Sequence, residues 1–275
     1  MNSILRKHTS MNDFSKVLKE IPYETRNLGI KALEISEFPL SRTSLELVKN
    51  YIEREKKINS KIFIQAKVPK AALQSAVLLQ KLGFYCIEIA LRPSVVLKTS
   101  AAYKLFREEP QSFIPAGFDP GKLTVKILSK DSLEQTNQVQ SISASSFTAD
   151  RFHQDPNCAD FVADQRFVFW VDEQLQDPSV RFFILEYKNS VIAFSSLREN
   201  DLVLIAFKKG FQNRKLGSFF FLQIFKQLDE EGFQSLATSI SASNTGMINL
   251  CSKLGFKFQD PSMTLHYWTS NSLNL

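Results

Sequence analysis

The chain has 275 residues, 44% of them hydrophobic and 23% charged, a balance typical of globular proteins. Its length suits one large domain or two of ordinary size, with enough apolar residues for a core. The net charge of +6 favours anionic partners such as phosphorylated cofactors or nucleotides. Lysine and arginine are scattered, with no basic block longer than a pair such as Lys208-Lys209, which argues against a nucleic-acid-binding protein.

The cysteines Cys86, Cys158 and Cys251 are odd in number and form neither a CxxC pair nor a zinc-ligand spacing. This pattern predicts reduced thiols and no bound metal. Residues 1–10 are polar, and no apolar run reaches the length of a membrane span. We therefore expect a soluble cytoplasmic protein.

Hydrophobic periodicity predicts strands alternating with helices in the first part of the chain. The expected elements are a strand at 31–35, a helix at 44–57, a strand at 61–66, a helix at 71–82 and an extended segment at 84–96. Gly83 follows the second helix, as is typical of helix C-termini. Proline and glycine are dense between residues 108 and 121, which predicts a linker.

A second unit is predicted after the linker. Its expected elements are a strand at 122–128, helices at 132–143 and 158–175, antiparallel strands at 181–187, 191–197 and 202–207, a helix at 215–230, a strand at 235–240, a helix at 245–254 and a strand pair at 256–268. Helical spacing predicts that two apolar sets point inward. These sets are Phe161, Val162, Phe169 and Trp170, and then Phe221, Ile224, Phe225 and Leu228.

Residues 79–84 and 251–256 share a Lys-Leu-Gly-Phe sequence, and both copies end an expected helix and begin an expected strand. Such junctions are common, so coincidence is one interpretation. We favour a duplicated unit, divided into residues 1–118 and 119–275. The first copy lacks a glycine-bearing basic turn, which predicts a structural or substrate-covering role for it.

Residues 207–218 connect an expected strand to an expected helix and carry Lys208, Lys209, Arg214 and Lys215. The unpaired amides of a helix's first turn and the helix dipole attract anions. Basic side chains nearby add to that attraction. The turn therefore predicts a site for a diphosphate. An ordinary turn with solvated basic residues is the alternative.

The segment from Gln212 to Gly217 resembles the Gln/Arg-x-x-Gly-x-Gly/Ala pattern of GNAT-superfamily N-acyltransferases, with Lys215 in place of the first glycine. Asn244 and the helix that ends at Gly255-Phe256 resemble the next part of that pattern. The resemblance implies a GNAT fold, which is α/β (α+β) with a mixed, mostly antiparallel sheet flanked by helices. It also implies acyl-CoA as co-substrate, bound by residues 119–275, with residues 1–118 a partial GNAT-like unit on the substrate side. The residues that it places at the donor are Phe207, Gln212, Asn213, Arg214, Lys215, Leu216, Gly217, Ser218 and Asn244.

The same resemblance suggests catalytic groups. Cys251 stands where the family usually has a tyrosine that protonates the leaving thiolate, and Tyr267 or a water are the other candidates. A buried, inert thiol is the alternative for Cys251. The backbone amide near Phe207 would stabilise the oxyanion. His153, Glu24 or a water chain would accept the proton of the attacking amine.

Two further windows resemble the nucleotide-amino-sugar N-acyltransferases (TDP-fucosamine acetyltransferase-like). They are residues 22–29 and residues 146–156, the latter followed by a helix that carries Trp170. The resemblance implies transfer to the amino group of a dTDP- or UDP-linked deoxysugar, for surface polysaccharide or glycan biosynthesis, including lipopolysaccharide. A homodimer is also plausible. The residues that it places at the substrate are Tyr23, Glu24, Arg151, His153, Asp155 and Trp170.

Two other functions remain open. The chain could acetylate another amine, such as a peptide, a lysine or an antibiotic. It could also be a degenerate GNAT fold without catalytic activity, because Lys215 and Cys251 both depart from the family pattern.

Overall fold

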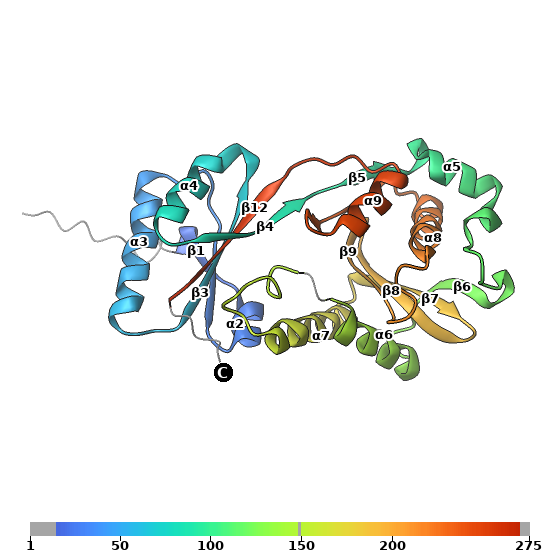
Figure 1. Ribbon diagram of the computed structural model, residues 1–275, viewed down its shortest axis with the longest axis horizontal. Helices are drawn as coiled ribbons and strands as arrows, with labels where there is room; N and C mark the ends of the chain where they lie inside the picture. The colour runs from blue at the N-terminus through green and yellow to red at the C-terminus, as the bar shows by residue number, and fades with distance from the viewer. Residues whose placement is uncertain (1–14, 148–149, 270–275) are drawn as a thin grey trace, which may run out of the picture. The chain divides into compact units, whose positions relative to one another are not determined.

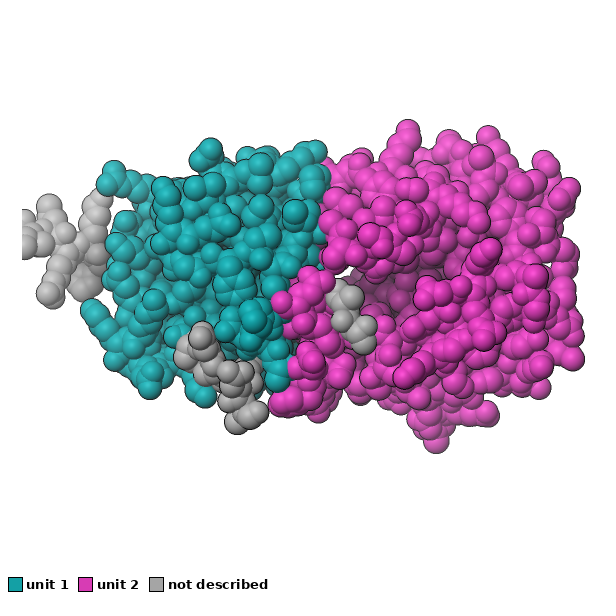
Figure 2. All heavy atoms as spheres, in the orientation of Figure 1, with its two compact units in different colours: residues 1–89, 155–159, 261–275 teal, residues 90–154, 160–260 magenta. Residues whose placement is uncertain are grey.

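The computed structural model describes residues 15–147 and 150–269. The chain forms two compact units, which Figure 2 shows in different colours. Unit 1 consists of residues 1–89, 155–159 and 261–275, and unit 2 consists of residues 90–154 and 160–260. No helix in the described part of the chain is both long and apolar enough to cross a membrane.

Unit 1 is built on a mixed sheet. Its strands, in spatial order, are β1 (Leu18–Glu20), β2 (Lys31–Ile35), β3 (Ile62–Pro69), β12 (Ser262–Trp268) and β4 (Tyr85–Leu91). Its helices are α2 (Pro22–Leu28), α3 (Arg42–Lys57) and α4 (Leu73–Lys81). The strands and helices expected between residues 31 and 91 are confirmed, whereas α2 was not predicted.

The core of unit 1 follows from the spacing of apolar residues. In α3, Val48, Tyr51 and Ile52 are buried together against the sheet. Ser41 caps this helix, because its side chain accepts a hydrogen bond from the Ser44 amide at 3.0 Å. The side chain of Ser41 thus satisfies one of the amides that the first turn of α3 would otherwise leave unpaired.

The C-terminal strand β12 completes the sheet of unit 1. It pairs antiparallel with β3 along its whole length, from Ser262 opposite Pro69 to Trp268 opposite Phe63. A strand from the far end of the sequence therefore lies in the interior of this sheet. Of the expected strand pair at 256–268, one strand forms, and Lys257 makes only an isolated bridge to Ser94.

Unit 2 contains a six-stranded mixed sheet (Figure 1). Its spatial order is β5 (Ser94–Val96), β10 (Ser235–Thr238), β9 (Asp201–Phe207), β8 (Ser190–Arg198), β7 (Val180–Tyr187) and β6 (Leu123–Ile127). The end of β4 also pairs with the short β11 (Ile240–Ser241). The strands predicted from 122 to 207 and at 235–240 are confirmed.

Strand β5 comes from the first part of the chain and forms one edge of the unit 2 sheet, antiparallel to β10. Unit 1 gains β12 from the second part, so each unit contains one strand from the opposite part of the sequence. The compact units therefore do not divide at residue 118. The assignment of 1–118 and 119–275 as functional domains stays a prediction.

Helices cover both faces of the unit 2 sheet. They are α5 (Ala101–Glu108), α6 (Leu133–Ser146), α7 (Asp160–Gln176), α8 (Leu216–Glu230) and α9 (Thr245–Lys253). One core contains residues of α5, α8 and α9 with Phe183 and Leu185 of β7. The other contains residues of α6 and α7 with Phe182 and Ile184. Successive residues of β7 thus point to opposite faces of the sheet, because side chains alternate in direction along a strand.

The predicted stripe of α8 is confirmed, since Phe221, Ile224, Phe225 and Leu228 are all fully buried. The predicted inward face of α7 is confirmed for Trp170, which packs against the core, and is wrong for Phe161. Phe161 is 56% exposed, while the buried set consists of Ala163, Arg166, Phe167, Val171 and Gln174. Phe161 is only the second residue of α7, and the packed face begins one turn later. Helix α5 was not predicted, because its eight residues are too few for periodicity to be read.

Candidate active site

The most distinctive feature of unit 2 is an open edge on strand β9. Parallel pairing with β10 is confined to two positions, Asp201 opposite Ala237 and Leu202 opposite Thr238. Beyond Leu202, β9 runs on to Phe207 without a strand partner on this side in the described residues. The two strands therefore diverge and leave main-chain groups of β9 open.

Hydrogen bonds on the β8 side of β9 show which of its amides point toward the open edge. The Lys208 amide donates to the Ile192 carbonyl of the neighbouring strand at 2.8 Å. Successive amides of a strand alternate in direction, so those of Ile205 and Phe207 point toward the open edge. In the described part of unit 1, the parallel strands β2 and β3 instead stay paired from Lys31–Ile62 to Ile35–Ala66.

The start of α8 faces the same region. The residue before the helix, Lys215, has φ 63° and ψ 9° and makes no side-chain cap. The amides of Leu216, Gly217 and Ser218 belong to the first turn, which has no intrahelical acceptors for them, and no acidic side chain lies in that turn. The positive end of the helix dipole is therefore uncapped by any side chain.

Lys215 has a left-handed backbone conformation, although a lysine is also able to adopt ordinary helical φ. Glycine is the residue that adopts positive φ without steric cost, which explains a glycine at this place in the family pattern. Asn213 also has positive φ, at 60°. The backbone shape of the turn is thus retained here despite the substitution.

A cavity of about 500 Å³ lies along these elements. Each of the residues predicted to bind the donor contributes to its lining: Phe207, Gln212, Asn213, Arg214, Lys215, Leu216, Gly217, Ser218 and Asn244. Among the described residues of the lining, the side chains of Arg214, Lys215 and Lys253 are cationic and none is a carboxylate. The cavity therefore suits an anion at the α8 end and an extended polar chain along β9.

Sequence reasoning missed several lining residues. They are Ser146, Ile205, Ala206, Phe211, Gly246, Met247, Leu250 and Lys253. Met247, Leu250 and Lys253 recur three residues apart and share one face of α9, a spacing that could have been read from Asn244 onward. Ser146 carries no local signal. Its hydroxyl donates to the Phe207 carbonyl at 3.0 Å, a contact that only the packing of α6 against the sheet creates.

Asn244 acts as the N-cap of α9, because its side-chain oxygen accepts a hydrogen bond from the Met247 amide at 3.0 Å. The cap also orients the side chain at the rim of the cavity that it lines.

Cys251 does not fit its predicted catalytic role. The residue is fully buried in the core with Leu254 and Phe256. Burial raises the pKa of its thiol to about 12, since the thiolate is poorly solvated there. It also does not line the donor cavity, because α9 turns Met247 and Leu250 toward the cavity instead. The alternative acid, Tyr267, belongs to the core of unit 1.

The predicted substrate residues fall into two groups. Arg151, His153 and Trp170 belong to unit 2, whereas Tyr23, Glu24 and Asp155 belong to unit 1. In unit 2, Gln154 donates to Ser243 Oγ at 3.1 Å, which places this segment beside the start of α9 and the donor cavity. Arg166, missed from the sequence, is buried beneath it, with its guanidinium carbon 4.7 Å from the Phe152 ring centroid and 5.5 Å from that of Trp170.

His153 lies between two carboxylates. Its Nδ1 contacts Asp150, and its Nε2 lies 3.0 Å from Asp164 Oδ1. Burial alone would lower the pKa of His153, but hydrogen bonds to Asp150 and Asp164 outweigh it and raise that pKa. Both ring nitrogens are engaged by carboxylates, so neither is free to take a proton from an amine. The predicted role of His153 as a base is therefore not favoured by this geometry.

Asp155 is the centre of a buried network in unit 1. One carboxylate oxygen accepts from Tyr85 Oη at 2.6 Å, and the other lies 2.7 Å from His266 Nδ1 and 2.9 Å from Trp268 Nε1. Burial opposes ionisation, yet hydrogen bonds from His266 and Tyr85 keep the pKa of Asp155 below its usual value. Glu24 is also buried, on α2.

The part of the chain that contains the candidate site is similar to a known protein family. Residues 144–256 match the model of the Acetyltransferase (GNAT) family, which spans α8, α9 and the open edge of β9. No curated protein matches the chain by sequence.

Solved structures with a similar fold cover most of the chain. A GCN5-related N-acetyltransferase from Sphaerobacter thermophilus is 10% identical, with a TM-score of 0.57 over 87% of this chain and 73% of that one. A tandem GNAT protein from the clavulanic acid biosynthesis pathway is 12% identical, with a TM-score of 0.55 over 87% and 75%. A glucosamine N-acetyltransferase region of a fungal multi-domain GH3 β-N-acetylglucosaminidase is 9% identical, with a TM-score of 0.60 over 86% and 30%. At these identities the likeness concerns the fold, which is the predicted GNAT fold.

Proposed function

We propose that this chain, whose residues 144–256 match the model of the Acetyltransferase (GNAT) family, transfers an acyl group from acyl-CoA to an amine. One observation carries the proposal. The open edge of β9 and the uncapped, cation-flanked start of α8 line a single cavity. An acyl-CoA molecule requires this combination, since it joins an amide-bearing arm to a diphosphate.

The residues that would hold the donor follow from their chemistry. The outward-pointing amide of Ile205 would pair with an amide group of the pantetheine arm, as one strand pairs with another. The first-turn amides of α8 and the side chains of Arg214 and Lys253 would hold the diphosphate. The bound donor supplies a thioester whose carbonyl carbon accepts the amine.

The protein contributes alignment and charge stabilisation. Holding the amine and the thioester together removes most of the entropic cost of their encounter. The Phe207 amide would stabilise the negative charge that develops on the carbonyl oxygen. The titratable side chains that line the cavity are Arg214, Lys215 and Lys253. No tyrosine or histidine is among the described residues that line the cavity, so we propose that solvent takes the proton of the attacking amine and protonates the thiolate released when the carbon–sulfur bond breaks.

For the acceptor, we propose the amino group of a nucleotide-linked amino sugar. The support is chemical: the segment from Asp150 to Gln154 lies beside the donor cavity and combines a cationic Arg151 with acidic and amide groups that bind sugar hydroxyls. A net charge of +6 also favours two anionic ligands at once. The glucosamine N-acetyltransferase with a similar fold adds plain amino sugars to the acceptors worth testing.

The test is a thiol-release assay with acetyl-CoA and a panel of acceptors. The panel contains dTDP- and UDP-amino sugars, glucosamine, a peptide amine, a lysine derivative and an aminoglycoside. Reactions without acceptor serve as blanks, because Cys86 is an exposed thiol that also reacts with the reagent. Thiol release with the nucleotide amino sugars, and acetylated product by mass spectrometry, is the expected result. Release only with another amine would overturn the acceptor assignment and keep the acyltransferase.

The burial of Cys251 favours one alternative, a GNAT fold that binds a partner and catalyses nothing. Titration with CoA, followed by calorimetry, separates the two functions. Saturable binding supports the enzyme, whereas no binding at millimolar CoA would overturn the proposed function altogether.

A further inference from the structure

Two neighbouring serines at the end of α6 make different hydrogen bonds. Ser145 Oγ donates to the Ser141 carbonyl at 3.3 Å, as serines inside helices commonly do. Ser146 Oγ instead donates to the Phe207 carbonyl at 3.0 Å, which is 61 residues away in sequence. The last residue of α6 therefore ties this helix to the end of β9.

The Phe207 carbonyl has a second donor. Gln212 Nε2 donates to it at 3.2 Å, so donors from α6 and from the turn at 207–218 meet at one oxygen. A carbonyl oxygen has two lone pairs, and both are engaged here. The same peptide group is also held on its other side, because the Lys208 amide donates to the Ile192 carbonyl at 2.8 Å. The peptide group that follows Phe207 thus has a fixed orientation.

Phe207 needs this support because of its position. It is the last residue of β9, on the edge that no strand covers in the described residues. Main-chain groups at such ends open readily. The N–H and C=O of one strand residue point to the same side of the strand. A tie on the Phe207 carbonyl therefore also fixes the direction of the Phe207 amide.

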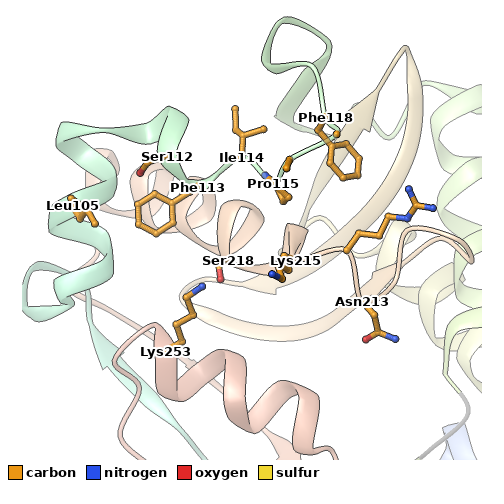
Figure 3. Close-up of a pocket in the computed structure, with 13 residues that line it drawn as sticks. Leu105, Ser112, Phe113, Ile114, Pro115, Phe118, Asn213, Lys215, Ser218 and Lys253 are labelled. Carbon is orange, nitrogen blue, oxygen red and sulfur yellow. The ribbon is translucent and has the colours of Figure 1, made fainter.

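The tie is separate from the charged end of the donor cavity. Figure 3 shows Lys215 and Lys253, two of the cationic lining residues, near the start of α8. Ser146 and Gln212 also line this cavity but are neutral. Of these two donors, Ser146 is partly buried and Gln212 is exposed, so water competes less with the serine hydroxyl. A change at Ser146 should therefore leave the diphosphate end of the cavity unaltered.

We infer that Ser146 is a positioning residue for acyl transfer, whose hydroxyl holds the Phe207 carbonyl and so keeps the Phe207 amide aligned with the thioester oxygen. The inference rests on the proposed function and deepens it. Gln212 assists as the second, exposed donor. Ser146 acts through Phe207 and transfers no proton, since its own proton is engaged by the carbonyl. Alignment matters because an oxyanion donor stabilises the developing charge only when it is directed at that oxygen in advance.

The test compares Ser146→Ala with the parent in the thiol-release assay, with the acceptor that gives the parent its highest rate. We expect kcat to fall about tenfold, because the Phe207 amide is less well aligned. The KM for acetyl-CoA, and the CoA affinity from calorimetry, should stay within about twofold of the parent values. Ser146→Thr keeps a hydroxyl at this position and should restore kcat to within about threefold.

Ser145→Ala is the matched control. Ser145 is the exposed neighbour of Ser146 on α6, and its hydroxyl bonds within the helix. This variant should leave kcat unchanged.

A second measurement reports on the tie without any acceptor. The Lys208 amide belongs to the same peptide group as the Phe207 carbonyl, so it should exchange with solvent more slowly when that carbonyl is held. We expect its hydrogen exchange, followed by NMR, to be several-fold faster in Ser146→Ala and unchanged in Ser145→Ala.

The outcomes separate this inference from the proposed function. If the parent releases no thiol with any acceptor, the proposed function fails and the role of Ser146 fails with it. If the parent is active and Ser146→Ala keeps kcat within about twofold, acyl transfer stands and the positioning role is wrong. Equal losses in Ser146→Ala and Ser146→Thr would show that the hydroxyl is not responsible. A loss confined to KM or CoA affinity would place Ser146 in donor binding instead. Unchanged Lys208 exchange in Ser146→Ala would show that the hydroxyl does not hold this peptide group.

Discussion

Gly217 of α8 and Leu250 of α9 are in such close contact that a β-carbon on Gly217 would lie 2.8 Å from Leu250 Cδ2. Both residues line the donor cavity, so the two helices approach each other closely there. The glycine at this place therefore has a packing reason, in addition to giving a phosphate access to the backbone.

Gly217→Ala should weaken CoA binding several-fold, because Leu250 must turn toward the cavity or α8 must move. Leu250→Ala in the same chain should restore most of the affinity, with a coupling energy on the order of 1 kcal/mol. Calorimetric titration of the two single variants and the double variant measures this. Additive losses in the double variant would show that the contact does not control the cavity.

Lys215→Gly should stabilise the fold by about 1 kcal/mol, since glycine adopts the left-handed conformation of this position without the steric cost paid by other residues. CoA affinity should be unchanged or higher. Thermal unfolding and calorimetry measure the two effects.

Lys215→Ala is the matched control, because it removes the charge and keeps the unfavourable φ. We expect it to bind CoA less tightly than Lys215→Gly. Equal and large losses in both variants would show that the ammonium group itself holds the phosphate, and the role given to the backbone would be wrong.

Cys251→Ala should leave turnover within tenfold of the parent, a change in barrier of less than about 1.4 kcal/mol. Its thiol is buried with a pKa of about 12 and is too far into the core to protonate a leaving group. Stability should fall by about 1 kcal/mol because a small cavity is created. Cys86→Ala, at an exposed thiol, controls for nonspecific effects. A hundredfold loss confined to turnover in Cys251→Ala would restore the catalytic role.

Asp155→Asn should destabilise the protein by about 3 kcal/mol, because His266 and Trp268 lose a charged acceptor in a buried site. The pKa of Asp155 is lower in the folded than in the unfolded protein. Its contribution to stability is therefore present above the unfolded pKa, about 3.9, and is lost as pH falls through the folded pKa. Urea unfolding between pH 3 and 7 should show a smaller pH dependence in the variant. If the free energy of unfolding fell equally at low pH in the variant and the parent, the stabilising role given to the Asp155 carboxylate would be wrong.

His153 should titrate above its ordinary pKa in NMR spectra, and Asp164→Asn should lower that pKa. A histidine pKa that is raised on folding stabilises the protein below the unfolded value of about 6.5, and this contribution is lost as pH rises through the folded pKa. Asp172→Asn, the same change elsewhere on α7, is the control and should not move the His153 signal. A His153 pKa unaffected by Asp164→Asn would mean that the two side chains are not coupled in solution.

The local features of the donor cavity could be predicted from the sequence. The turn at 207–218, the helix after it and its buried stripe depend on residues that are near one another in the chain, and hydrophobic spacing reports on these directly. The position of Cys251 could not be predicted in this way. Whether a helix residue points into a cavity or a core depends on the rotation of the whole helix, and packing against Gly217 and Phe221 decides that rotation.

By itself, the sequence determined the order of the longer strands and helices, the cationic turn and the anion-attracting start of α8, because backbone geometry and side-chain charge act over a few residues. Only the tertiary structure decided that β5 and β12 each complete the sheet of the opposite part of the chain, that β9 diverges from β10, and that Ser146 and Lys253 enter the cavity. These are long-range pairings, chosen by the burial and hydrogen bonding of segments far apart in sequence, on which local patterns carry no information.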